Sequence, residues 1–217
     1  MGALGWPAQL REGAVTLRPL RLRDGPAWVE MRVRNEGWLV RWEATPPGLD
    51  VRYGWAQRQT LGIYTTMVRG LRRQARAGTA LPFGINLNGQ LVGQITVSNI
   101  VRGAFNSGSV GYWVDERVAG RGVMPTALAL VVDHSFGTAA LHRIEANIRP
   151  ENTASRRVVE KLGFREEGLQ QRLLAIDGAY RDHLGFAVTT EDVPEGMLAR
   201  WRATRGAHVP GSRRFDH

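Results

Sequence analysis

The run Arg117-Val118-Ala119-Gly120-Arg121-Gly122 has the residue types of a phosphate-binding loop. Residues 109–114 before it are aromatic and β-branched, as in a buried strand, and residues 123–128 after it carry apolar residues at helical spacing. The loop therefore joins a strand to a helix, whose first turn has unpaired backbone N–H groups. Glycines let that backbone approach a phosphate, and Arg117 and Arg121 add positive charge. We expect an anionic ligand here; a plain strand-to-helix turn is the alternative.

The ligand class can be narrowed from what the chain lacks. The loop has neither the Lys-Ser/Thr pair of a P-loop nor the glycine spacing of a dinucleotide fingerprint, so ATP and NAD are disfavoured. The chain has no cysteine, which excludes disulfides, thiolate nucleophiles and cysteine-ligated metals. His134 and His142 have no partner at metal-ligand spacing, and we expect no metal.

A second polar pair, Glu145 and Asn147, lies on a predicted strand over residues 143–149, where alternate side chains share one side. Only Glu145 can accept a proton, so it is the candidate general base. An ion pair with Arg143 or Arg149 is the structural alternative.

The elements that position these residues alternate between strands and helices. Residues 15–20 predict a strand, followed by a helix capped by Asp24. A second helix is predicted from a cap at Asp50 to Arg76, with a four-apart apolar stripe that we expect to face the core; a binding face is the alternative. That stripe consists of Ile63, Met67 and Leu71.

The remaining elements follow from turn signals. Residues 83–97 predict a hairpin on Asn88-Gly89, and residues 169–188 predict another on Asp177-Gly178. A helix over residues 153–162 ends at Gly163. Asp192 and Pro194 are expected to open a C-terminal helix. The pattern predicts an α/β layered fold, with residues 1–205 as one domain and residues 206–217 as a disordered tail.

The composition is strongly basic. The formal net charge is +9, the isoelectric point is near 11.1, and Lys161 is the only lysine. The basic residues are scattered apart from Arg72-Arg73-x-x-Arg76 and Arg213-Arg214, so an anionic cofactor and transient contact with a ribonucleoprotein both fit the charge. No apolar run approaches the length of a membrane span and no signal pattern is present, so we expect a cytoplasmic protein, as a monomer or homodimer.

Two motifs resemble those of the GNAT acyltransferases. Arg-x-x-Gly-x-Gly is similar to their coenzyme A pyrophosphate loop, and Asn152-x-x-Ser155 before a helix ending in Leu162-Gly163-Phe164 is similar to their second cofactor motif. Residues 98–105, 111–113 and 174–183 further resemble the RimJ-type N-terminal alanine acetyltransferases that modify a ribosomal protein. The similarity covers roughly residues 14–195.

The resemblance implies a GNAT fold, in which a mixed, mostly antiparallel sheet has helices on both faces and two strands that splay like a V. Acetyl-CoA would enter one side and the amine the other. Asn152 would hydrogen-bond the pantetheine arm, act as a helix N-cap, or do both. The implied cofactor-binding residues are Trp113, Val114, Arg117, Val118, Gly120, Arg121, Gly122, Val123, Asn152 and Arg156.

The resemblance also implies catalytic roles. Ser155 would protonate the departing thiolate, because Val159 stands where many relatives have the tyrosine that serves as the acid. Alternatively, Ser155 is a serine of the first helical turn that only hydrogen-bonds backbone groups. A backbone N–H near Val114 would stabilise the oxyanion of a tetrahedral intermediate. An α-amine with a pKa near 7.7–8.0 is partly neutral at pH 7, so a proton relayed by water past Glu145 or Asn147 would suffice.

The acceptor amine is expected on the other side of the V. Asp182 would attract an α-ammonium or hold Arg181 in place. The implied acceptor-binding residues are Arg102, Phe105, Tyr112, Tyr180 and Asp182. We expect acetyl transfer to a protein N-terminus, with a ribosomal protein as the leading substrate. A small-molecule amine is the second reading, and a non-catalytic RNA- or ribosome-associated module is the third.

Overall fold

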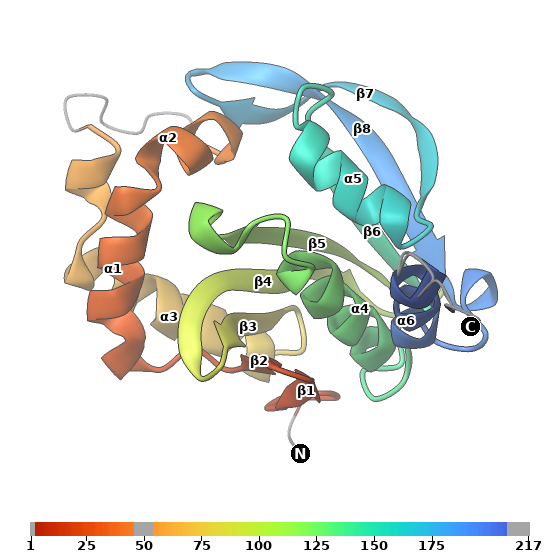
Figure 1. Ribbon diagram of the computed structural model, residues 1–217. Helices are drawn as coiled ribbons and strands as arrows, with labels where there is room; N and C mark the ends of the chain where they lie inside the picture. The colour runs from red at the N-terminus through yellow and green to blue at the C-terminus, as the bar shows by residue number, and fades with distance from the viewer. Residues whose placement is uncertain (1–2, 46–53, 208–217) are drawn as a thin grey trace, which may run out of the picture.

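The computed structural model describes residues 3–45 and 54–207. Within them, eight strands form one mixed sheet in the order β1-β2-β3-β4-β5-β6-β8-β7 (Figure 1). The strands are β1 (Leu10–Glu12), β2 (Val15–Arg18), β3 (Leu81–Leu87), β4 (Gln90–Val101), β5 (Ser107–Val114), β6 (Arg143–Ile148), β7 (Arg165–Ile176) and β8 (Ala179–Thr189). Both predicted hairpins are confirmed, as β3–β4 and β7–β8.

Helices cover both faces of this sheet, as Figure 1 shows with α4 in front and α3 behind. On β3, Phe83 and Ile85 pack into the large core beneath α4, whereas a Cβ at Gly84 would touch Leu20 of the smaller core beneath α1 and α3. Successive strand residues point to opposite faces, so the two cores lie on opposite sides. The helices are α1 (Gly25–Arg34), α2 (Glu36–Leu39), α3 (Leu61–Arg76), α4 (Val123–Phe136), α5 (Thr153–Lys161) and α6 (Met197–Ala207), with short 3-10 turns η1 (Leu22–Asp24), η2 (Val40–Trp42), η3 (Ala56–Arg58), η4 (Glu116–Val118) and η5 (Thr190–Asp192).

The sheet opens between β5 and β6. These strands run parallel and pair only from Ser107 with Arg143 to Ser109 with Glu145. Beyond that point β5 continues against β4 as far as Val114, while β6 follows β8. The expected splayed strands are thus present, and the gap between them is where a ligand can enter the sheet.

The structure differs from the sequence prediction in one helix cap and at the ends of two helices. Asp24 is at the N-cap position of α1, as predicted, but its carboxylate does not cap the helix: it accepts two hydrogen bonds from Arg18 and one from the Arg21 N–H. Helix α3 begins at Leu61 with Thr60 as its cap, and Asp50 lies outside the described residues.

At the C-terminus, Asp192 and Pro194 do not open α6. The helix starts at Met197, and the Met197 and Leu198 N–H groups donate to Asp133 on α4 at 2.6 and 3.0 Å. Sequence spacing could not reveal this cap because its carboxylate is remote in the chain. Helix α6 also extends to Ala207, past the predicted start of the tail at Gly206, and residues 208–217 lie outside the described part.

The apolar stripe of α3 lies partly in the core and partly at a cavity. Met67 and Leu71 pack against the smaller core, as predicted. The residues that α3 buries most deeply are Tyr64, Val68 and Ala75. Ile63 is 55% exposed and, with Met67, lines the cavity described below. A four-apart repeat identifies an apolar face but not whether core or cavity lies against it.

Candidate active site

A cavity of about 1600 Å³ lies where β5 and β6 diverge. One wall, the cofactor wall, comprises the end of β5, the glycine loop, the start of α4, the exposed face of α5 and part of α6. The other comprises α1, α2, η2 and the segment from Trp55 to α3. Six of the seven tryptophans line it: Trp28, Trp38, Trp42, Trp55, Trp113 and Trp201.

The glycine loop forms an anion cradle at the N-terminus of α4. Gly120 and Gly122 have φ of +75° and +78°, a conformation that side chains disfavour. Gly122 is the N-cap and supplies no side-chain cap, so the first backbone N–H groups of this 14-residue helix are available to a ligand. Gly120, Arg121 and Gly122 line the cavity, while Val123 is buried beneath it.

Asp115 holds the start of this loop. It accepts hydrogen bonds from Arg34 and Arg117 at 2.8 Å and from Asn35 at 3.2 Å. Burial raises the pKa of Asp115, but the hydrogen bonds from Arg117 and Arg34 outweigh it and hold that pKa well below its usual range. Arg117 therefore forms an ion pair with Asp115 and does not line the cavity, whereas Val118 and Arg121 do.

Four basic side chains line the cofactor wall without an ion pair to any described residue. They are Arg121, Arg157, Lys161 and Arg205. Arg156, the arginine expected from sequence, is not among them: it bonds the Pro150 carbonyl and lies 3.6 Å from Glu160. The cavity face of α5 carries Ala154, Arg157 and Lys161, at helical spacing, so Arg157 faces the cavity and the expected Arg156 does not.

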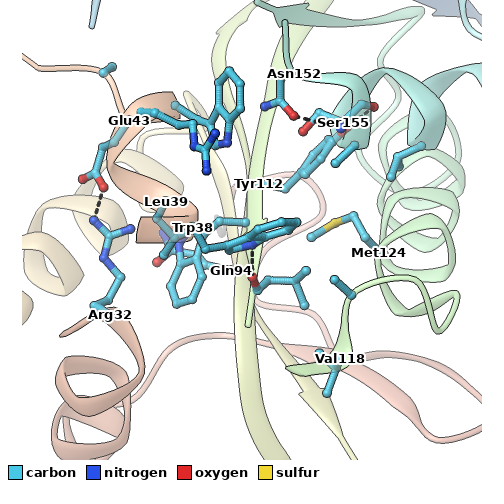
Figure 2. A pocket seen from close by; sticks show the side chains of 18 of the residues that line it. Arg32, Trp38, Leu39, Glu43, Gln94, Tyr112, Val118, Met124, Asn152 and Ser155 are labelled. Carbon is cyan, nitrogen blue, oxygen red and sulfur yellow. Dashed lines mark hydrogen bonds and ion pairs between the residues drawn. The ribbon is translucent and has the colours of Figure 1, made fainter. Parts of the chain in front are cut away.

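The start of α5 brings three expected residues together, as Figure 2 shows. Asn152 caps the helix, with its side-chain oxygen accepting the Ser155 N–H at 3.1 Å, and both residues line the cavity. Tyr112 on β5 donates its hydroxyl to the Ser155 carbonyl at 3.3 Å. Burial raises the pKa of Tyr112 above its usual value, so the phenol stays protonated.

Strand alternation directs the backbone of β5 into the gap. Because the Asp115 N–H donates to Val92 on β4 at 2.8 Å, the N–H and C=O of the neighbouring Val114 point away from β4. The indole N–H of Trp38 donates to that Val114 carbonyl at 3.1 Å. Val114 and Trp113 therefore line the cavity where the cofactor wall meets the opposite one.

Glu145 and Asn147 share one side of β6, as expected, but neither lines the cavity. Glu145 accepts a hydrogen bond from Arg143 at 2.7 Å, the structural alternative proposed from the sequence. Asn147 accepts one from Gln170 on β7 at 3.0 Å. Both polar groups are engaged within the sheet.

The other expected acceptor residues also lie away from the cavity lining. Arg102 bonds the Ala139 carbonyl at 2.5 Å, and Phe105 is 63% exposed in the loop before β5, at the closed end of the V. On the β7–β8 hairpin, Tyr180 is 59% exposed and Asp182 accepts the Arg172 N–H at 2.8 Å. Of the five, only Tyr112 lines the cavity.

The family model described as acetyltransferase (GNAT) domain matches residues 14–165. The chain belongs to the GNAT acetyltransferase family. Over 183 residues it is 33% identical to the [ribosomal protein uS5]-alanine N-acetyltransferase of Escherichia coli, covering 81% of this chain and 88% of that protein. The structure of Mycobacterium smegmatis RimJ in complex with CoA-disulfide superposes with a TM-score of 0.86 at 44% identity, covering 94% and 97% of the two chains. The probable N-acetyltransferase YjcK of Bacillus subtilis is 40% identical over 103 residues, 48% of this chain and 57% of that protein.

This GNAT chain is an acetyl-CoA-dependent N-acetyltransferase, and its cofactor wall fits the coenzyme. The left-handed glycines and uncapped α4 terminus suit a pyrophosphate, and the four unpaired basic side chains suit the remaining negative charge of coenzyme A. In the described residues, no group of three or more His, Asp or Glu side chains could hold a metal ion. No helix in this same part is long and apolar enough to cross a membrane.

The residues that sequence reasoning missed form the opposite wall. Arg32, Glu43 and the tryptophans of α1, α2 and η2 are dispersed over residues 28–55, with no spacing that marks a site. The available signal was compositional, because four of the seven tryptophans fall within those 28 residues. Such clustering of large amphipathic rings is common at ligand-binding surfaces.

Proposed function

We propose that the enzyme transfers the acetyl group of acetyl-CoA to the N-terminal α-amine of a protein, with a ribosomal protein as substrate. The observation that carries this is the cavity itself, which joins a coenzyme A cradle to a second, tryptophan-lined compartment opposite it. The relatives support the substrate class, because the Escherichia coli protein named for alanine acetylation of uS5 aligns over 81% of this chain.

Bound acetyl-CoA supplies an activated thioester carbonyl. The Gly120–Gly122 backbone and the first turn of α4 would hold its pyrophosphate, and Asn152 would bond its pantetheine arm. The Val114 N–H points into the gap and is the donor we assign to the developing oxyanion.

Ser155 is the proton donor that we assign to the leaving thiolate. It lines the cavity, and its position is fixed by the Asn152 cap and by the Tyr112 hydroxyl on its carbonyl. Glu145 is held by Arg143, so we assign it no direct proton transfer. An α-amine needs little help from a base near pH 7, which favours an N-terminal acceptor over a lysine side chain.

A cytoplasmic location and transient contact with the ribosome would follow from this substrate. The exposed Arg69, Arg73 and Arg76 on α3 form no ion pair with another described residue, and they could face ribosomal RNA. Loss of binding to ribosomes in the triple Arg→Gln variant, with peptide acetylation unchanged, would support that contact.

Substrate class is tested by CoA release from acetyl-CoA with a panel of acceptors. The panel contains peptides beginning with Ala, Ser or Met, an N-terminally blocked lysine peptide, and small amines such as a polyamine and an aminoglycoside. The proposal predicts release only with free peptide α-amines. Release with the small amines alone would replace it with small-molecule acetylation.

A further inference from the structure

Arg32 and Glu43 form an ion pair in the wall opposite the coenzyme cradle. Arg32 is only 5% exposed, and its guanidinium lies over three indole rings, 5.2 Å from Trp28, 4.6 Å from Trp55 and 5.3 Å from Trp113. Its Nε donates to Gln59 at 3.2 Å. A cation buried this deeply costs free energy unless it is paired and hydrogen-bonded, and these contacts supply both.

The consequence for Glu43 is a fixed orientation. Its Oε2 atom accepts from Arg32 and from the Trp55 indole N–H, the latter at 3.1 Å. Its Oε1 atom accepts no hydrogen bond from any residue of the described ranges, and 39% of the side chain is exposed. One carboxylate oxygen is thus anchored, and the other is available to a ligand in the cavity.

Glu43 and Ser155 lie on opposite sides of the cavity, with Tyr112 between them (Figure 2). The reacting amine must lie at the Ser155 and Val114 end, where the thioester would be. Glu43 therefore faces a part of the acceptor that is remote from the reacting nitrogen. An anchored carboxylate with one free oxygen suits a cationic side chain, which gains an ion pair with it.

We propose that Glu43 is a specificity-determining residue that binds a lysine or arginine side chain shortly after the acceptor's N-terminal residue, and that Arg32 positions it. This inference rests on the proposed N-terminal acetyltransferase function. It adds a sequence requirement to the acceptor beyond a free α-amine.

The test uses the wild-type enzyme first, so that it does not depend on the folding of a variant. Peptides with a free N-terminal Ala carry Lys, norleucine or Glu at one of the next four positions, and kcat/KM is measured for each. Lys is expected to exceed norleucine by about tenfold at one position, with Glu lowest. Equal kcat/KM values for the three residues at every position would overturn the inference. A preference for Glu would overturn it too, and would point to Arg41 of the same wall.

Variants then assign the preference to Glu43. Glu43→Gln should abolish the preference for Lys, so that kcat/KM for the Lys peptide falls to the value for the norleucine peptide. Glu36→Gln is the matched control, because Glu36 is exposed on α2 outside the cavity lining. Retention of the preference in folded Glu43→Gln overturns the assignment.

Two safeguards keep the outcomes separate. Because Glu43→Gln leaves the charge of Arg32 uncompensated, its melting temperature is measured, and Glu43→Asp provides a second variant that keeps the charge but shortens the reach; it should weaken the preference. If no peptide is acetylated at all, the proposed function fails, whereas equal acetylation of all peptides leaves that function standing and removes only the role of Glu43.

Discussion

Replacing Gly122 with alanine should weaken coenzyme A binding in addition to its cost to the fold. Gly122 has a φ of +78°, where an L side chain costs about 1–2 kcal/mol. An added Cβ would lie 3.5 Å from the Trp201 ring, an ordinary contact, so the protein itself imposes no further clash. We expect the melting temperature to fall by about 2–8 °C.

The effect on the ligand has a separate origin. The new methyl group stands at the N-terminus of α4, where a phosphate must approach the uncapped backbone N–H groups. Loss of one charge-assisted hydrogen bond costs about 1.5–3 kcal/mol, so the Kd for coenzyme A should rise by roughly 10- to 100-fold. Isothermal titration calorimetry with coenzyme A measures this directly.

Gly89→Ala is the matched control. Gly89 has a φ of +83° in the β3–β4 turn, and an added Cβ there meets no atom within 4 Å. It should lose similar stability while its Kd for coenzyme A stays unchanged. If Gly122→Ala binds coenzyme A as tightly as Gly89→Ala does, the glycine loop does not hold the pyrophosphate.

Three further predictions concern proton donation, the cofactor's charge and acid stability. Ser155→Ala should lower kcat by about 100-fold or more with little change in the KM for acetyl-CoA, and an unchanged kcat would remove Ser155 from the chemistry. Arg157→Gln should weaken coenzyme A binding several-fold, whereas Arg156→Gln should not, as titration calorimetry of both variants will show. The hydrogen bond from Arg143 lowers the pKa of Glu167 to about 2, so its stabilisation is present above pH 4.5 and is lost as the pH falls toward 2. Denaturant unfolding of Glu167→Gln should therefore show a smaller loss of stability from pH 5 to pH 3 than the wild type shows; equal losses would contradict this.

Local sequence signals predicted much of the fold and the cofactor wall. Asn88-Gly89 and Asp177-Gly178 fix tight hairpins because their backbone conformations are specific to these residues. The glycine loop and the Asn152 cap were also readable, since each is a contiguous motif at the start of a helix.

The errors arise where a side chain's partner is remote in sequence. The carboxylate of Asp133 on α4 caps α6. Arg32 on α1 pairs with Glu43, which lies beyond α2 and η2, and hydrogen-bonds Gln59 from the segment before α3. On α5 the sequence suggested Arg156 for the cavity, whereas Arg157 lines it. The two arginines have the same chemistry, and only the orientation of the helix distinguishes them. The wall opposite the coenzyme cradle was missed for the same reason, because tertiary packing assembles it from residues that are dispersed in the sequence.

Transfer to a protein's α-amine can be tested with a single substrate. A peptide with both a free N-terminal alanine and an internal lysine is incubated with the enzyme and acetyl-CoA, and tandem mass spectrometry locates the added acetyl group. We expect a single acetyl group on the N-terminal nitrogen. Acetylation of the lysine side chain instead would show that the enzyme is not an N-terminal acetyltransferase.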